Sequence, residues 1–145
     1  HNRGRQELSF TAALHGYLRV AQVEQASLHG LEGLSYWDAA AAEPNTHVTQ
    51  EGCVSFGAET DRVYPRAAAA VQLQSSGRPW LRLAQDASWS ETVVWNPGAT
   101  LCARLPDMPA DAWRDFVCIE AAQIDTPALL APGDLWHGWQ SFQAC

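Results

Sequence analysis

Apolar and polar residues alternate along much of this chain, and the run from Phe116 to Ala122 combines that pattern with an anomaly. Successive side chains of a β-strand point to opposite faces, so the alternation predicts a strand. The expected core-facing positions are Val117, Ile119 and Ala121, and the opposite face carries Phe116, Cys118 and Glu120. We therefore expect a single carboxyl group in a largely apolar wall.

Two interpretations of Glu120 are open at this point. Removal from water disfavours the ionised form and raises the pKa of a carboxyl group toward neutrality, which is the value that a general base working near pH 7 needs. A glutamate near a strand end could equally be solvated or paired with an arginine, because buried carboxylates are rare unless they have a partner.

Further strands are predicted wherever alternating or short apolar runs are bounded by turn residues. The expected ranges are 8–20, 22–28, 67–74, 78–84, 91–95 and 135–142. Residues 75–77 and 96–98 have the composition of tight turns, and only residues 106–113 carry the start signals of a helical turn. The chain is therefore predicted to be all-β, built from antiparallel sheet.

Composition narrows the class of protein. The 145 residues are 47% hydrophobic and 17% charged, which predicts one globular domain over residues 1–145. The 9 basic residues are all arginines and face 16 acidic ones, so the net charge of -7 argues against nucleic acid or an anionic membrane as a partner. No apolar run approaches the roughly 20 residues of a membrane span. The four cysteines lack zinc-ligand spacing, and we expect reduced thiols in a soluble, cytoplasmic protein.

Two polar positions outside the Glu120 strand are candidates for a site. His15 lies beside Tyr17 on the more polar side of the first predicted strand, where it would suit a cleft, although an isolated histidine can also be purely structural. Glu59, Asp61 and Arg62 form a close charged cluster. The cluster is either a local ion pair or a polar grip on a hydroxylated ligand, since carboxylates accept hydrogen bonds from sugar hydroxyls.

Several chemistries lack their sequence signatures. The chain contains no glycine-rich phosphate loop, dinucleotide fingerprint, GxSxG elbow or HxH and HxxxH metal pair, so no cofactor or metal is expected. The 7 tryptophans are many for this length. Any single one is expected in the core rather than stacked on a sugar.

Five motifs in a fixed order resemble the hexose-6-phosphate mutarotases, the glucose-6-phosphate 1-epimerase branch of the aldose 1-epimerase superfamily, which has the galactose mutarotase-like fold. The motifs are Phe10-Thr11-Ala12-Ala13-Leu14-His15-Gly16-Tyr17, Gly30-Leu31-Glu32-Gly33-Leu34-Ser35-Tyr36-Trp37-Asp38, Glu59-Thr60-Asp61-Arg62-Val63-Tyr64, Trp95-Asn96-Pro97-Gly98 and Phe116-Val117-Cys118-Ile119-Glu120. Together they span nearly the whole chain.

The resemblance implies an antiparallel β-supersandwich whose concave face binds a hexose or hexose 6-phosphate without a cofactor. It implies that His15 is the general acid, Glu120 the general base and Asp61 a ligand of substrate hydroxyls. It also implies that residues 1–145 are the C-terminal portion of a longer domain, because the family's phosphate-binding arginines and a further histidine have no counterpart here. Gly16-Tyr17-Leu18 replaces the family's more usual Thr-Tyr-Phe.

Three hypotheses follow. The first is an epimerase that interconverts the α and β anomers of an aldohexose 6-phosphate by acid/base ring opening and closure. The second is a non-catalytic carbohydrate-binding or structural β-domain derived from the same scaffold. The third adds that two copies complete each other's sheet, because half a sandwich leaves open strand edges and exposed apolar surface.

Overall fold

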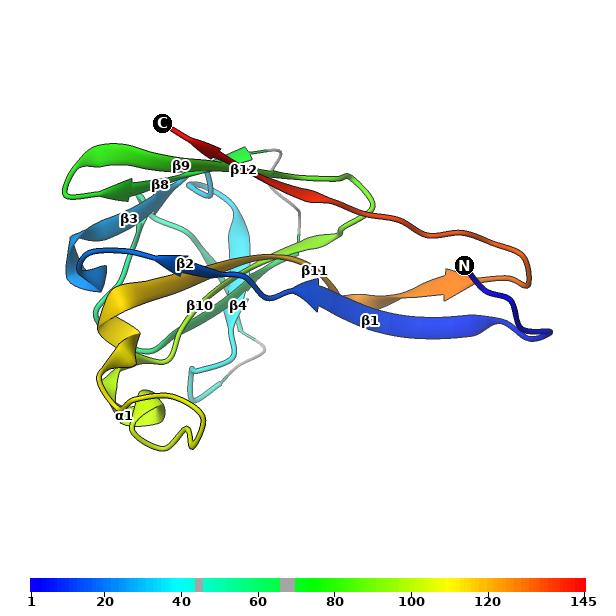
Figure 1. The fold of residues 1–145 in the computed structure, drawn as a ribbon, viewed down its shortest axis with the longest axis horizontal. Coiled ribbons are helices and arrows are strands. Elements are labelled where there is room, and N and C mark those ends of the chain that lie inside the picture. Colours follow the sequence, from blue (N-terminus) through cyan, green and yellow to red (C-terminus); the bar gives the residue numbers. More distant parts are fainter. Residues whose placement is uncertain (44–45, 66–69) are drawn as a thin grey trace.

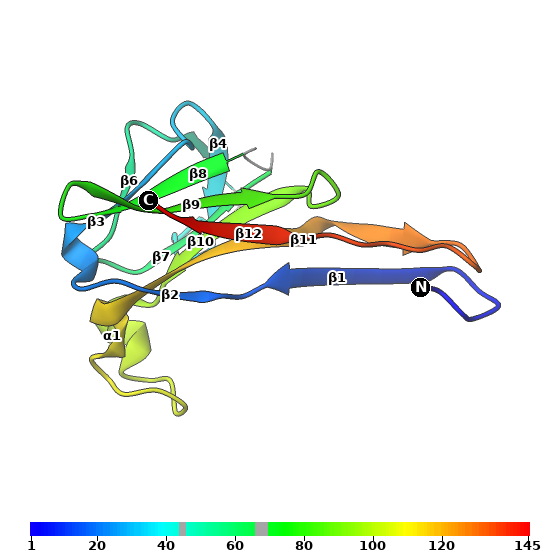
Figure 2. The ribbon, with the colours of Figure 1, turned by 45° about the horizontal axis from the view of Figure 1, so that its top comes forward.

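The computed structural model describes residues 1–43, 46–65 and 70–145, which form two antiparallel sheets (Figures 1 and 2). The larger sheet has the order β1-β11-β10-β7-β4-β5, with β2 also paired to β11, and the smaller sheet has the order β12-β9-β8-β3-β6. The larger sheet comprises β1 (Leu8–Leu14), β2 (Tyr17–Arg19), β4 (Ser35–Asp38), β5 (His47–Thr49), β7 (Thr60–Tyr64), β10 (Glu91–Asn96) and β11 (Phe116–Leu130). The smaller sheet comprises β3 (Ala26–His29), β6 (Val54–Ser55), β8 (Ala70–Ser75), β9 (Arg78–Gln85) and β12 (Gln140–Ala144).

Helical structure is slight. The described residues contain one short helix, α1 (Gly98–Cys102), and two single 3₁₀ turns, η1 (Val23–Gln25) and η2 (Ala112–Asp115). The all-β prediction is confirmed.

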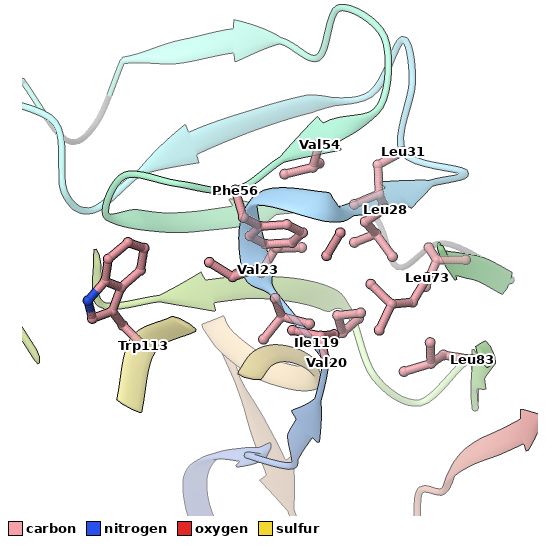
Figure 3. Close-up of a cluster of buried hydrophobic side chains, with 14 of the residues drawn as sticks. Val20, Val23, Leu28, Leu31, Val54, Phe56, Leu73, Leu83, Trp113 and Ile119 are labelled. Carbon is pink, nitrogen blue, oxygen red and sulfur yellow. The ribbon is translucent and has the colours of Figure 1, made fainter. Parts of the chain in front are cut away.

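The main core fills the space between the two sheets (Figure 3). Val117 and Ile119 of β11 share it with Leu28 of β3 and Leu73 of β8, and all four are fully buried. Burying an aliphatic side chain of this size stabilises a fold by about 1.5–3 kcal/mol, so the contacts among these four residues fix which face of β11 points inward. Because strand side chains alternate, Glu120 must face away from the second sheet, as the sequence pattern predicts.

The strand predicted over residues 8–20 is wrong in one place, since β1 ends at Leu14 and β2 begins at Tyr17. Two hydrogen bonds account for the break. The amide of Gly16 turns back to donate to the carbonyl of Leu14 at 3.0 Å, and the side-chain amide of Gln140 donates to the carbonyl of Ile119 at 2.9 Å. The ladder is therefore interrupted opposite Ile119, and residues 15 and 16 are free of strand pairing.

Other boundaries also differ from prediction. The strand expected at 22–28 begins only at Ala26, after η1, and the strand expected at 135–142 begins only at Gln140. Gly138 precedes that strand and lies so close to Trp89 that an added Cβ would approach its indole nitrogen to 2.6 Å. The strand expected at 67–74 lies partly outside the described residues, and β8 starts at Ala70. The hairpin at 75–77 is confirmed, with φ of 50° at Ser76 and 72° at Gly77.

An arm extends from the body of the protein. β1 and the later half of β11 run side by side past the edge of the smaller sheet (Figures 1 and 2). Leu8 on β1 and Leu129 on β11 are exposed there, at 46% and 62% of their surfaces. The arm thus presents apolar side chains to solvent, which soluble domains usually cover.

Candidate active site

Strand pairing places His15 across from Glu120. Leu14 pairs with Ala121 on one side of the break, and Tyr17 pairs with Cys118 on the other, so the register is the same on both sides. His15 consequently falls opposite Glu120, although the two are far apart in the sequence. His15 lies where the strand pairing with β11 would continue, but the break leaves it outside the backbone hydrogen bonds of the sheet.

The two side chains meet. Nδ1 of His15 lies 3.3 Å from Oε1 of Glu120. The imidazole is 46% exposed, whereas the carboxyl side chain is only 6% exposed. The pair therefore has a solvent-facing imidazole above a buried carboxyl group, within reach of proton transfer.

Apolar side chains surround the carboxyl group of Glu120. Val93 pairs with Glu120 across the ladder and Val63 pairs with Val93, so all three side chains share one face of the larger sheet. Val63, Val93 and Ala122 form a second buried cluster on this face. Burial here, and secondly the negative charge of Asp61, raise the pKa of Glu120 to about 7 from an ordinary 4.5. The interpretation of Glu120 as a buried carboxyl group is the one that the structure supports.

Asp61 belongs to the same face. It pairs with Trp95, which pairs with Cys118 two residues before Glu120. Burial, and secondly the nearby carboxylates of Asp38 and Glu59, raise the pKa of Asp61 to about 6. The three predicted site residues, His15, Glu120 and Asp61, thus lie toward one face of the larger sheet, and β10 separates Asp61 on β7 from Glu120 on β11.

Arg62 does not join them. Its guanidinium lies 3.7 Å from a carboxylate oxygen of Asp38, donates to the side-chain oxygen of Gln50 at 3.0 Å and stacks on the ring of Tyr36. Because Asp61 and Arg62 are consecutive in β7, their side chains point to opposite faces. Of the two interpretations of this charged cluster, the local ion pair describes Arg62, which pairs with Asp38 and points away from the face that carries Asp61.

Aromatic rings flank the imidazole of His15. Tyr17 stacks on His15 with ring centroids 5.1 Å apart and planes 13° apart, and Trp95 meets His15 edge-on at 5.5 Å. Phe116 in turn packs against both Tyr17 and Trp95. Tyr17 was anticipated as a neighbour of His15, but the part played by Trp95 was missed, because tryptophans were expected in the core. Its position opposite Cys118 follows only from the register of β10 and β11.

Cys118 lies beneath the pair. It is fully buried, on the same face of β11 as Glu120. Its sulfur, an imidazole nitrogen of His15 and a carboxylate oxygen of Glu120 all lie within 4.8 Å of one another. Spacing rules for zinc motifs could not reveal this group, since His15 lies between β1 and β2 whereas Cys118 and Glu120 lie on β11. These three residues are the ones in the described part of the chain that could jointly ligate a metal ion.

The structure is thus a β-sandwich with a histidine and a buried glutamate in contact on one face of its larger sheet. Residues 1–143 match the family described as Aldose 1-epimerase. The chain therefore belongs to the aldose 1-epimerase family, as its motifs suggested.

Individual relatives indicate which members of the family the chain resembles. Proteins from Escherichia coli K12 and Salmonella typhimurium LT2, each named "Putative glucose-6-phosphate 1-epimerase", are 31% and 30% identical over 80% and 83% of this chain. The crystal structure of YeaD from Salmonella typhimurium, described as a "putative mutarotase", matches 88% of the chain and 42% of its own with a TM-score of 0.77 at 27% identity. The structure of HI1317 shares the fold, with a TM-score of 0.74 at 19% identity over 94% of this chain and 47% of its own. The predicted galactose mutarotase-like sandwich is confirmed.

The match is partial in length. The chain spans 39–40% of the two bacterial relatives. A relative from Cenchrus ciliaris with the same name, 27% identical over 90% of the chain, is likewise covered over 39% of its length. Among the described residues, no helix is both long and apolar enough to cross a membrane.

Proposed function

We propose that the protein interconverts the α and β anomers of an aldohexose 6-phosphate, and that residues 1–145 are the C-terminal portion of its catalytic domain. The observation that carries the proposal is the 3.3 Å contact between an exposed imidazole and a buried carboxyl group whose pKa is near 7. Such a pair can hold and release a proton at neutral pH. The family match supports epimerisation of an aldose. The names of the relatives are the reason for proposing a 6-phosphate on that aldose.

The reaction needs one base and one acid. The Glu120 carboxylate removes the proton from the anomeric hydroxyl, the bond between C1 and the ring oxygen breaks, and the ring oxygen takes a proton from the His15 imidazolium. Rotation about the C1–C2 bond and the reverse proton transfers close the ring as the other anomer. Both oxygens are bonded to C1, so an acid and a base that lie side by side can serve them together.

The surroundings suit a sugar. Tyr17 and Trp95 offer flat apolar surface next to His15, on which the C–H face of a pyranose can pack. Asp61 offers carboxylate oxygens to sugar hydroxyls from the same sheet face. Asp38 and Glu59 add further negative charge near Asp61, and Arg62 is engaged with Asp38 and Gln50. We therefore place the phosphate-binding residues in the part of the domain that this chain does not include.

The test is anomer equilibration by the complete protein. Freshly dissolved α-glucose 6-phosphate is supplied to a dehydrogenase that oxidises only the β anomer, and the rate above the uncatalysed background is measured. His15→Ala and Glu120→Gln should each lower kcat/KM by about 10²–10⁴-fold, the usual contribution of a positioned acid or base. The matched control is Glu51→Gln, which alters an exposed glutamate outside the strands and should keep the full rate.

Two outcomes would contradict the proposal. Full activity in either site variant would remove His15 or Glu120 from the mechanism. Tight binding of the sugar by the complete protein without any acceleration would instead favour a carbohydrate-binding domain on the same scaffold.

A further inference from the structure

Two buried donor atoms converge beneath His15. Cys118 and Glu120 alternate with core residues on β11, so their side chains project from the same face, and both residues are more than nine-tenths buried. His15 covers them from the solvent side through its 3.3 Å contact with Glu120. The thiol of Cys118 plays no part in the proposed proton transfers, so its presence needs a separate account.

We propose that His15, Cys118 and Glu120 form a binding site for a divalent transition-metal ion, with zinc as the preferred ion, and that the bound ion inhibits the enzyme. One nitrogen, one sulfur and one oxygen donor make a borderline-soft set, which suits Zn²⁺ better than Mg²⁺ or Ca²⁺ because those ions take oxygen ligands.

The distances allow this coordination. Tetrahedral zinc with bonds of about 2.0–2.3 Å holds its ligand atoms roughly 3.3–3.8 Å apart. The three donor atoms already lie within 4.8 Å of one another, so a shift of about 1 Å would complete the set. His15 can make that shift, because it lies at the strand break and its side chain is half-exposed. A fourth position is left for water.

The local charge also favours a cation. Asp61 acts on Glu120 as a nearby negative charge, and Asp38 and Glu59 act in the same way on Asp61. Cys118 binds a metal ion as its thiolate, so binding breaks the S–H bond, forms a metal–sulfur bond and releases the proton to solvent.

The consequence for catalysis follows from the ligand set. A zinc ion on Nδ1 or Nε2 of His15 and on the carboxylate of Glu120 occupies the acid and the base at once. Inhibition should therefore be relieved by a chelator, and sugar and zinc should compete. The inhibition depends on the proposed epimerase activity, whereas metal binding does not.

The binding test uses Co²⁺, which takes zinc's ligands and gives a thiolate-to-metal charge-transfer band when sulfur is bound. The complete protein, kept reduced, is titrated with Co²⁺ and the ion is then displaced by Zn²⁺. Cys118→Ser should abolish the band and weaken zinc binding at least tenfold, since it removes the soft ligand. Cys102→Ser is the matched control, because Cys102 is equally buried but lies in α1, where its thiol donates to the carbonyl of Pro109.

Each outcome decides the question. A band that survives Cys118→Ser and disappears on removing the exposed Cys145 would overturn the proposal in favour of adventitious binding. If Cys118→Ser does not fold, His15→Ala replaces it, and unchanged zinc affinity in that variant would overturn the proposal. In the activity arm, the ratio of zinc-inhibited to uninhibited rate is compared within each variant. Binding through Cys118 by a protein without epimerase activity would support the metal site while refuting the proposed function.

Discussion

The ionisation of Glu120 should cost the folded protein a measurable share of its stability. Its pKa rises from 4.5 to about 7 on folding, because the carboxyl group is buried and lies near Asp61. A raised carboxyl pKa means that the folded state binds the proton more tightly than the unfolded state. The associated stability is complete below about pH 4.5 and is lost as the pH rises through about 7.

The magnitude follows from the two values. Between about pH 5 and about pH 8, this one group should lower the free energy of unfolding by roughly 2–3 kcal/mol. Glu120→Gln keeps the shape of the protonated side chain and removes the titration. Relative to the unmodified protein, the variant should therefore gain roughly 2–3 kcal/mol of stability between these pH values.

The assay is urea unfolding followed by tryptophan fluorescence at several pH values. Other groups titrate in the same range, so the informative quantity is the difference between Glu120→Gln and the unmodified protein. Glu51→Gln, at an exposed position, should show no pH-dependent difference. The reasoning is refuted if the stability difference between Glu120→Gln and the unmodified protein changes with pH by less than about 0.5 kcal/mol, or changes in the opposite direction. The carboxyl group would then be as well solvated in the folded state as in the unfolded state.

Three further predictions test the surroundings of the pair. Asp61→Asn removes the negative charge near Glu120 and should lower the pKa of Glu120. The rising limb of the pH profile of kcat/KM, near pH 7 in the unmodified protein, should therefore move to lower pH. A limb that does not move would exclude an effect of Asp61 on Glu120. Tyr17→Leu removes the ring stacked on His15 and should lower kcat/KM about two- to tenfold, whereas Tyr17→Phe should keep the stacking and the rate. Gly98→Ala should destabilise by about 2–3 kcal/mol in thermal or urea unfolding, because φ is +59° and the new Cβ would lie 2.6 Å from the amide nitrogen of Glu59. Gly77→Ala, with φ of +72° but open space, should cost only about 1 kcal/mol, and equal losses in the two variants would contradict the steric argument.

The faces of the strands were predictable from the sequence. The ends of β9 and β10 were predicted to within one residue, whereas those of β1, β3 and β12 were not. Alternation in residues 116–122 was enough to assign Ile119 to the core and Glu120 to the opposite face, because the period of a strand is 2. The break at His15 depends on a hydrogen bond from Gln140, which no local pattern could reveal. For the same reason, the late start of β12 follows from the packing of Gly138 on Trp89 and not from propensity.

The motifs named His15, Asp61 and Glu120 as candidate site residues, and pairing between distant strands brings them to one face of the larger sheet. Their roles remain a prediction, and their geometry was only partly predictable. The separation of Arg62 from Asp61 follows from strand alternation and was available from the sequence once the strand was recognised. Trp95 and Cys118 became visible as neighbours of His15 only through the register of β10, β11 and β2.

The gap between β1 and β2 has a consequence for how this family can vary. Exposed connections usually tolerate insertions and deletions, but here the same register continues on both sides of a two-residue gap. One added or lost residue would force either the preceding or the following strand to slip, and a slip of one position turns every side chain of that strand over. The length of this short surface segment should therefore be fixed as strictly as the length of a core strand.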